Sequence, residues 1–444
     1  MMQAKAVPAG RLSRAASTVH LQPPAARQLA EDLLQLGTGA RTQTPLESDI
    51  ARRMALVQKL KVLAAGEIKG SDELKEATRC LHDVLDATIA SDDICAILAR
   101  DEAAVKVLDD LARQRGSRMA EAQALALRVL VNVGSLKAGA AATADIGSMN
   151  TCLDQVRTLR MTSPQAQRDM GVVALRGICN LIAGTGGCCG AHVAASKVVT
   201  VTLTISRDSE ELCENVCLAL ASIASIAEGA SAIISARGHK AIFSSLLARG
   251  QTVSHFVKAF NSEDDAKRVS ELQVHALWAL RNLSSHPVGR ERLSTDLPAL
   301  VAVATIFTHC DDSRAVEHAA AMLANLVKTE TGLHLAMAAS TCNFMLNLLE
   351  IGLFIEDFTP GNHALCVLLN MLRSYECLEY CLEEQYYKPV GGLLKVQLGV
   401  GTACAWCDLE LVLGVLANLT SHKYGYELVV LETDVESAVL QVAT

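Results

Sequence analysis

Histidines and cysteines are the side chains of this sequence that could bind a metal or act in catalysis. His275, His318 and His363 recur in the similar stretches HALW, HAAA and HALC, each seven residues before an asparagine. Zinc needs ligand atoms at about 2.0–2.1 Å around one point, whereas residues on neighbouring helices are about 8–10 Å apart. A metal site is therefore disfavoured. Two hypotheses stay open: the imidazoles pack or cap helix starts, or they form a stripe that gains up to about three charges between about pH 7.5 and 5.5.

Other candidate chemistry is sparse. CAWC (Cys404 to Cys407) has redox or zinc spacing but no second pair to complete four ligands. GTGGCCG, beginning at Gly184, lacks the Lys-Ser/Thr of a phosphate-binding loop. The 15 cysteines are scattered singly through apolar stretches, which indicates a reducing, intracellular compartment. Because we find no catalytic triad, acid–base pair or metal set, we expect a non-enzymatic protein without a cofactor.

An asparagine in the middle of apolar helical stretches is the feature that repeats. The stretches are ALRVLVNV, ALRGICNL, ALWALRNL, AAAMLANL, ALCVLLNM and VLGVLANL, with Asn132, Asn180, Asn282, Asn325, Asn370 and Asn418. Two weaker copies have Asp86 and Ser222 at this place. The spacings run from 42 to 60 residues, mostly in the forties. This period predicts a helical solenoid.

The elements that position these asparagines are helices. Within each period the sequence predicts a short helix, a middle helix and a long third helix that carries the asparagine. Turn residues break the pattern at Gly184–Gly187, Ser284–Gly289 and Thr359–Asn362. The predicted array covers residues 49–424, with an insertion around 249–270 that accounts for the longest spacing. Residues 425–444 form an incomplete capping repeat.

Composition limits the function classes. Of the 444 residues, 50% are apolar and 3% aromatic, and the net charge of −8 argues against general nucleic-acid binding. We find no membrane span and expect a monomer. Residues 1–48 have no acidic side chain before Glu31, so they are either a flexible basic tail or a mitochondrial presequence. We expect a cytoplasmic protein, with nuclear, ciliary or mitochondrial localisation left open.

The third-helix pattern, above all ALWALRNLSS, resembles armadillo repeats, the module of β-catenin and importin-α, over about residues 49–444. The resemblance implies an all-α, right-handed superhelix of about eight three-helix repeats, whose third helices line a concave groove. It also implies that the six asparagines bind the main chain of an extended peptide, with Trp278 as a neighbouring platform. Importin-α has a tryptophan four residues before the asparagine in many repeats, and here only Trp278 remains.

The residues lead to the same groove independently. A buried unpaired amide costs about 1–3 kcal/mol, and six of them would consume most of a domain's net stability of about 5–15 kcal/mol. The asparagines must therefore face water, a backbone partner or a ligand. They either join neighbouring parts of the array or contact a bound segment, and both hypotheses stay open.

The charge of the asparagine face predicts the kind of partner. The basic residues assigned to this face are Arg79, Arg128, Arg176, Lys328 and Arg373, and the only assigned acid is Asp86. The pattern predicts an adaptor or scaffold that binds extended acidic or phosphorylated protein segments through bidentate arginine contacts. The alternative is a structural component of a cytoskeletal, axonemal or other large assembly. A nuclear transport adaptor is less favoured, because its groove wall should be acidic.

Overall fold

The computed structural model describes residues 55, 58, 70–114, 116–187, 192–205, 208–247, 252–260, 269–310, 312–338, 359–399, 409–422 and 424–433. Its regular elements are helices, and the described residues contain no strand. The chain divides into Met1–Met54 and Ala55–Thr444. The predicted tail, the CAWC stretch and the last eleven residues of the predicted cap lie outside the described residues.

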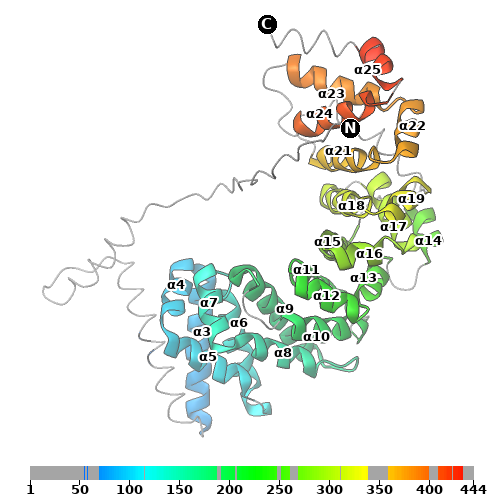
Figure 1. Ribbon diagram of the computed structural model, residues 1–444. Coiled ribbons are helices and arrows are strands. Elements are labelled where there is room, and N and C mark those ends of the chain that lie inside the picture. The colour runs from blue at the N-terminus through cyan, green and yellow to red at the C-terminus, as the bar shows by residue number, and fades with distance from the viewer. Residues whose placement is uncertain are drawn as a thin grey trace, which may run out of the picture. The chain divides into compact units, whose positions relative to one another are not determined.

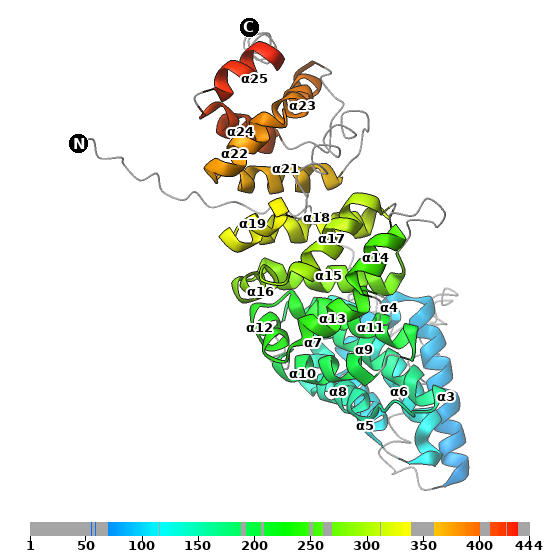
Figure 2. The ribbon, with the colours of Figure 1, turned by 90° about the vertical axis from the view of Figure 1, so that its right-hand side faces the viewer.

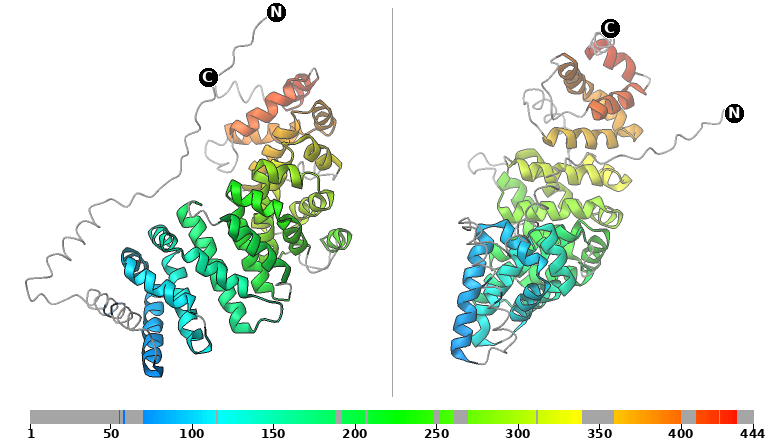
Figure 3. Two further views of the ribbon diagram at one scale, coloured as in Figure 1. Left: turned by 60° about the horizontal axis from the view of Figure 1, so that its bottom comes forward. Right: turned by 90° about the vertical axis from the view of Figure 1, so that its left-hand side faces the viewer.

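Eight helices carry the asparagine position or its equivalent, and each one contacts the next along the chain (Figure 1). These third helices are α3 (Ser71–Ala90), α6 (Ala120–Val133), α9 (Gln165–Thr185), α11 (Glu210–Ala224), α15 (Glu271–Ser285), α18 (Ser313–Leu326), α21 (Thr359–Met371) and α24 (Leu409–Thr420). Figure 3 shows the helices stacked in the order of the sequence, from blue through green to red. The predicted succession of third helices is confirmed.

The segments that follow the third helices contain the remaining helices. They are α4 (Asp92–Arg100), α5 (Glu102–Arg113), the 3₁₀ turn η1 (Ser117–Met119), α7 (Lys137–Ile146), α8 (Ser148–Thr158), α10 (His192–Ile205), α12 (Ala227–Ser235), α13 (Gly238–Leu246), α14 (Val253–Phe260), α16 (Pro287–Leu293), α17 (Leu297–His309), α19 (Glu330–Ala338), α22 (Tyr375–Glu383), α23 (Tyr387–Gly399) and α25 (Gly425–Thr433). Figure 2 shows α12, α16, α19 and α22, the first helices of four repeats, along one edge of the array. We call this the first-helix edge.

The repeats are less uniform than the sequence predicts. Between α9 and α11 the described residues form only α10, whereas α12, α13 and α14 separate α11 from α15. Helix α14 falls within the predicted insertion around residues 249–270 and packs against α17 of the following repeat. The insertion therefore contributes a helix to the array.

The apolar stripe of α15 shows why these segments form helices that stack. Ala276, Ala279, Leu280 and Leu283 are completely buried, as their three-and-four spacing predicts. The helix begins with a capping box, in which Ser270 and Gln273 each bond the other's backbone N–H. It ends at Ser285, where the predicted break in SSHPVG separates it from α16.

A glycine seven residues after the asparagine position fixes how a first helix meets a third helix. At Gly289 an added Cβ would lie 2.0 Å from the carbonyl oxygen of Leu283. The same close approach, at 1.8–2.2 Å, recurs at Gly139, Gly229, Gly332 and Gly425. The first helix therefore crosses the end of the third helix with direct backbone contact, which a larger residue would prevent.

Candidate functional site

Asparagines of the third helices cap the helix of the preceding repeat. The direct bonds join Asn180 Nδ2 to the Val131 carbonyl at 3.0 Å, Asn282 Nδ2 to the Ala221 carbonyl at 2.9 Å, and Asn370 Nδ2 to the Ala324 carbonyl at 3.3 Å. Each acceptor directly precedes the asparagine or serine position of its own helix and is among the helix's last four carbonyls. Such carbonyls have no partner within their helix. The amide of the next repeat supplies one.

Two other asparagines reach the preceding helix through a hydroxyl group. Asn132 Nδ2 donates to Thr88 Oγ1 at 3.1 Å, and Asn325 Nδ2 donates to Ser284 Oγ at 3.2 Å. Both hydroxyls donate to a carbonyl of their own helix, Leu85 at 2.8 Å and Arg281 at 2.7 Å. Leu85 and Arg281 again directly precede the asparagine position of their own helix. Thr88 and Ser284 stand two residues after that position, so a hydroxyl side chain there replaces the direct bond by a relayed one.

The side-chain N–H groups of these asparagines thus join neighbouring repeats, as the first of the two hypotheses states. Their carbonyl oxygens differ, because within the described residues Oδ1 of Asn132, Asn180, Asn282 and Asn370 accepts no hydrogen bond. Oδ1 of Asn325 accepts from Lys328 Nζ at 3.2 Å. All these side chains are half-buried, which leaves them within reach of a bound segment.

The remaining asparagine positions depart from this pattern. Asn418 on α24 is half-buried, and its side chain makes no hydrogen bond with the described residues. Ser222 on α11 instead donates to the Leu218 carbonyl of its own helix at 3.2 Å. The bond between α9 and α11 comes from Arg176, whose Nε donates to Asn215 Oδ1 at 3.0 Å.

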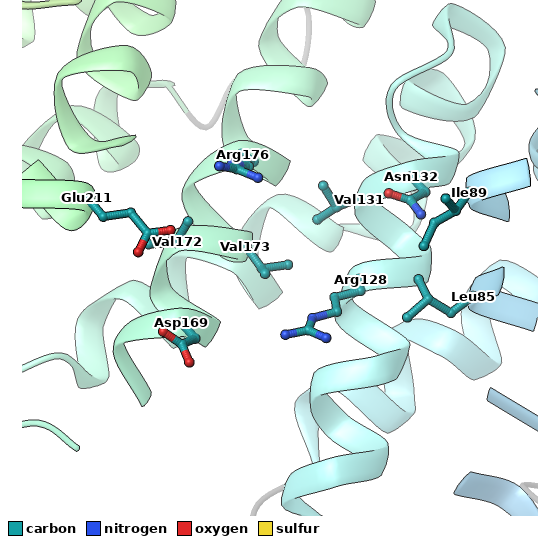
Figure 4. Close-up of a pocket in the computed structure, with 10 residues that line it drawn as sticks. All are labelled: Leu85, Ile89, Arg128, Val131, Asn132, Asp169, Val172, Val173, Arg176 and Glu211. Carbon is teal, nitrogen blue, oxygen red and sulfur yellow. The ribbon is translucent and has the colours of Figure 1, made fainter. Parts of the chain in front are cut away.

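A cavity of about 400 Å³ opens along the third helices α3, α6, α9 and α11 (Figure 4). Its apolar lining consists of Leu85, Ile89, Val131, Val172 and Val173, and its polar lining of Arg128, Asn132, Asp169, Arg176 and Glu211. The structure therefore brings together Arg128, Asn132 and Arg176 of the predicted groove residues. We call this cavity the N-terminal groove.

The N-terminal groove is not uniformly basic, which corrects the expectation that Asp86 is its only acid. Arg128 is exposed and has no hydrogen-bond or ion-pair partner among the described residues. Glu211 reaches in from α11, and Asp169 accepts a hydrogen bond from Gln165 Nε2 at 2.6 Å. Two arginines thus face two carboxylates across an apolar floor.

The acids of the asparagine face share a position in the repeat. Eleven residues before the asparagine position stand Glu121, Asp169, Glu211 and Glu271 in four consecutive third helices. Eleven residues are almost exactly three helical turns, so these residues lie on the asparagine face. Acids near a helix start also interact well with the helix dipole, which makes this periodic signal easy to overlook.

The other predicted basic residues lie outside the N-terminal groove. Arg79 forms an ion pair with Glu76 at 2.7 Å on α3. Arg373 is exposed just after α21.

Trp278, His275 and His318 come together on α15 and α18, and His363 on α21 lies 4.0 Å from Glu317 of α18. The rings of Trp278 and His318 are stacked, with centroids 6.2 Å apart and planes at 14°. The ring centroid of His275 lies 6.5 Å from that of Trp278, with the two planes tilted by 45°. Ring contacts thus join His275, Trp278 and His318 of the predicted row, and all three histidines are half-buried.

Burial and Arg281 keep His318 neutral, whereas the nearby Glu317 favours its charged form. Arg281 Nη1 lies 3.0 Å from both Glu317 Oε1 and His318 Nδ1. Because a guanidinium can only donate, Nδ1 accepts and the proton of His318 is on Nε2. Burial, and secondly Arg281, lower the pKa of His318 to about 4.

The pKa values of His275 and His363 are lowered mainly by burial as well. The pKa of about 4 for His318 argues against a gain of charge by all three histidines between about pH 7.5 and 5.5, because desolvation disfavours the imidazolium form. Within the described residues, no group of three or more His, Cys, Asp or Glu side chains could hold a metal ion.

The comparisons with known proteins support the fold. No protein-family model matches the sequence, and no curated protein matches it. The structure resembles an engineered protein with a TM-score of 0.53 and 20% identity, over 87% of this chain and 98% of the other. It also resembles a structure from a study of a phosphorylation switch that controls the interaction between cadherin and β-catenin. The TM-score is 0.55 and the identity 11%, over 89% of this chain and 69% of the other. The fold is the armadillo-type α-solenoid. The prediction of this all-α fold is confirmed.

This chain is also similar to the solved structure of a designed armadillo repeat protein. The identity is 17% over 61% of this chain and 98% of the other, and the TM-score is 0.44. In this armadillo array none of the described helices has the length and apolar character needed to cross a membrane.

Proposed function

We propose that this armadillo solenoid is a non-catalytic scaffold that binds an extended segment of a partner protein across its third helices. The observation that carries the proposal is the N-terminal groove, where the described residues leave the carbonyl oxygen of half-buried Asn132 and the guanidinium of neighbouring Arg128 without a hydrogen-bond partner. An amide oxygen can accept from the backbone N–H of any residue, so it holds an extended chain regardless of sequence.

The charges of the groove specify the partner further. Arg128 and Arg176 suit an acidic or phosphorylated side chain, because guanidinium groups form bidentate, charge-assisted hydrogen bonds with such anions. Asp169 and Glu211 favour a basic residue in the same segment. Ile89 and Val173 offer apolar surface between them. We therefore expect a segment that carries an apolar residue together with an acid and a base.

The test is to reverse the two arginines. In R128E/R176E, binding of partners isolated with the wild-type chain should weaken about ten-fold or more at low salt, because attraction becomes repulsion. The effect should shrink as salt rises, since exposed charges are screened over about 8–10 Å. Affinity purification with quantitative mass spectrometry identifies the partners, and anisotropy with their labelled segments gives the affinities.

The matched control is R100E/R292E, which makes the same change in charge at exposed arginines of the first helices α4 and α16. Loss of the same partners in both variants would show that only net charge matters. Unchanged partners in R128E/R176E would exclude the groove and favour a structural component of a large assembly.

A further inference from the structure

Tyrosine is confined to one end of the array. All 6 tyrosines of the chain lie between residues 375 and 426. Tyr386 and Tyr387 are buried, but Tyr375, Tyr424 and Tyr426 are 65%, 58% and 57% exposed. Exposed aromatic rings that gather at one place mark a contact surface, because tyrosine is enriched in protein interfaces.

The rings of Tyr375 and Tyr424 gather around His422. The centroid of the His422 ring lies 5.5 Å from that of Tyr375 and 5.8 Å from that of Tyr424. The Tyr424 backbone N–H donates to His422 Nδ1 at 3.3 Å. The proton of this ring is therefore on Nε2, which donates to the Tyr375 hydroxyl oxygen at 3.2 Å.

The chain of bonds ends at a carboxylate. The Tyr375 hydroxyl donates to Glu379, one helical turn further along α22, and the hydrogen bond to this carboxylate raises the pKa of Tyr375. We call Tyr375, Glu379, His422 and Tyr424 the tyrosine patch. Because these bonds already restrict Tyr375, less side-chain entropy is lost when a partner binds.

The tyrosine patch belongs to the first-helix edge. Helix α22, which follows the third helix α21, packs against α24, and α25 follows α24 through the segment with His422 (Figure 2). The N-terminal groove, in contrast, is formed by the third helices of the first repeats. The two surfaces therefore use different helices and different repeats.

The charge around the tyrosine patch selects the partner. Residues 375–384 contain four glutamates and no lysine or arginine, and the basic residues nearest to the patch in sequence are Arg373, Lys388 and Lys423. Glu376, Glu379, Glu383 and Glu384 are all exposed. Aromatic faces attract cations, and a carboxylate with one hydrogen bond still has acceptor sites for a guanidinium. An acidic segment would be repelled, and a second copy of this acidic chain is disfavoured for the same reason.

We propose that the tyrosine patch is a docking site for an arginine-containing segment of a partner protein. The guanidinium stacks on the exposed tyrosine rings and donates to Glu379 and Glu376. The proposal is independent of the groove, so a partner could be held at both surfaces at once.

The experiment measures the anisotropy of a labelled, capped peptide with three arginines spaced by glycine and serine, titrated with the full chain. Counterpart peptides carry lysine or the uncharged arginine analogue citrulline. We expect the arginine peptide to bind most tightly. In Y375A/E379Q its affinity should fall about five-fold or more, because both the cation–π contact and the charge-assisted bond are lost.

The matched control E102Q/M161A removes one exposed acid and one exposed apolar side chain elsewhere, at Glu102 on α5 and at Met161 after α8. It should bind like the wild type, and Y375F, which keeps the ring, should lose less affinity than Y375A/E379Q. Equal binding of the citrulline peptide, equal loss in the control, or no binding by the wild type would each overturn the proposal. Self-association abolished by Y375A/E379Q would assign the tyrosine patch to a second copy instead.

Discussion

Asn282 offers the sharpest test of the bonds between repeats. Its amide caps the Ala221 carbonyl, and Ala221 is completely buried. In N282A this carbonyl loses its partner in a place that water reaches poorly. An unsatisfied buried acceptor costs about 1–3 kcal/mol, so the free energy of unfolding should fall by about that amount.

Asn325 is the matched comparison because its bond is relayed. It donates to Ser284 Oγ, and this hydroxyl keeps donating to the Arg281 carbonyl when the asparagine is removed. N325A therefore leaves no carbonyl unsatisfied. Its cost should be only the net contribution of one hydrogen bond, about 0.5–1.5 kcal/mol.

The assay must resolve single repeats, because stability in a solenoid is nearly a sum of local terms. Native-state hydrogen exchange of α11 and α15 meets this need. A loss of about 1–3 kcal/mol corresponds to exchange about 5 to 150 times faster in these helices of N282A, since each 1.4 kcal/mol is ten-fold. Urea unfolding of both variants gives the total change.

Two results would refute the reasoning. If N325A loses as much stability as N282A, the distinction between the direct and the relayed cap has no energetic meaning. If N282A changes exchange less than about two-fold, the Ala221 carbonyl is satisfied in another way, for instance by water.

Two further predictions concern the contacts between helices and the histidines. G289A should lower stability by about 1–3 kcal/mol in thermal or urea unfolding, because its Cβ would lie 2.0 Å from the Leu283 carbonyl. G70A, where the nearest atoms lie at 3.7 Å, should change little, and equal effects would contradict the proposed backbone contact. His318 should titrate near pH 4 in histidine-labelled NMR spectra, since burial and Arg281 lower its pKa to about 4. The stability that neutral His318 contributes is complete above the unfolded-state pKa of about 6.5 and declines as the pH falls toward 4. The pH dependence of the free energy of unfolding should therefore shrink in H318Q. A titration midpoint of His318 near 6.5 would contradict the burial argument.

The organisation of the array was predictable from the sequence because it depends on periodic, local features. The recurring asparagine located the third helices, and the spacing of Ala276, Leu280 and Leu283 identified the buried face. Turn residues located the break before α16. A helix buries one side wherever it packs, so its residue period determines its core without knowledge of its neighbours.

The partners of the candidate site residues were decided by the tertiary structure. Whether an asparagine meets a carbonyl or a hydroxyl depends on a residue 41 to 61 positions earlier, which only the stacking of the repeats brings close. The mixed charge of the N-terminal groove arises because Glu211 reaches from α11 toward residues of α6 and α9. The histidines stay neutral because neighbouring helices cover them and place Arg281 beside His318. Sequence period determines which face of a helix is buried, but distances and desolvation between helices are set only by their packing.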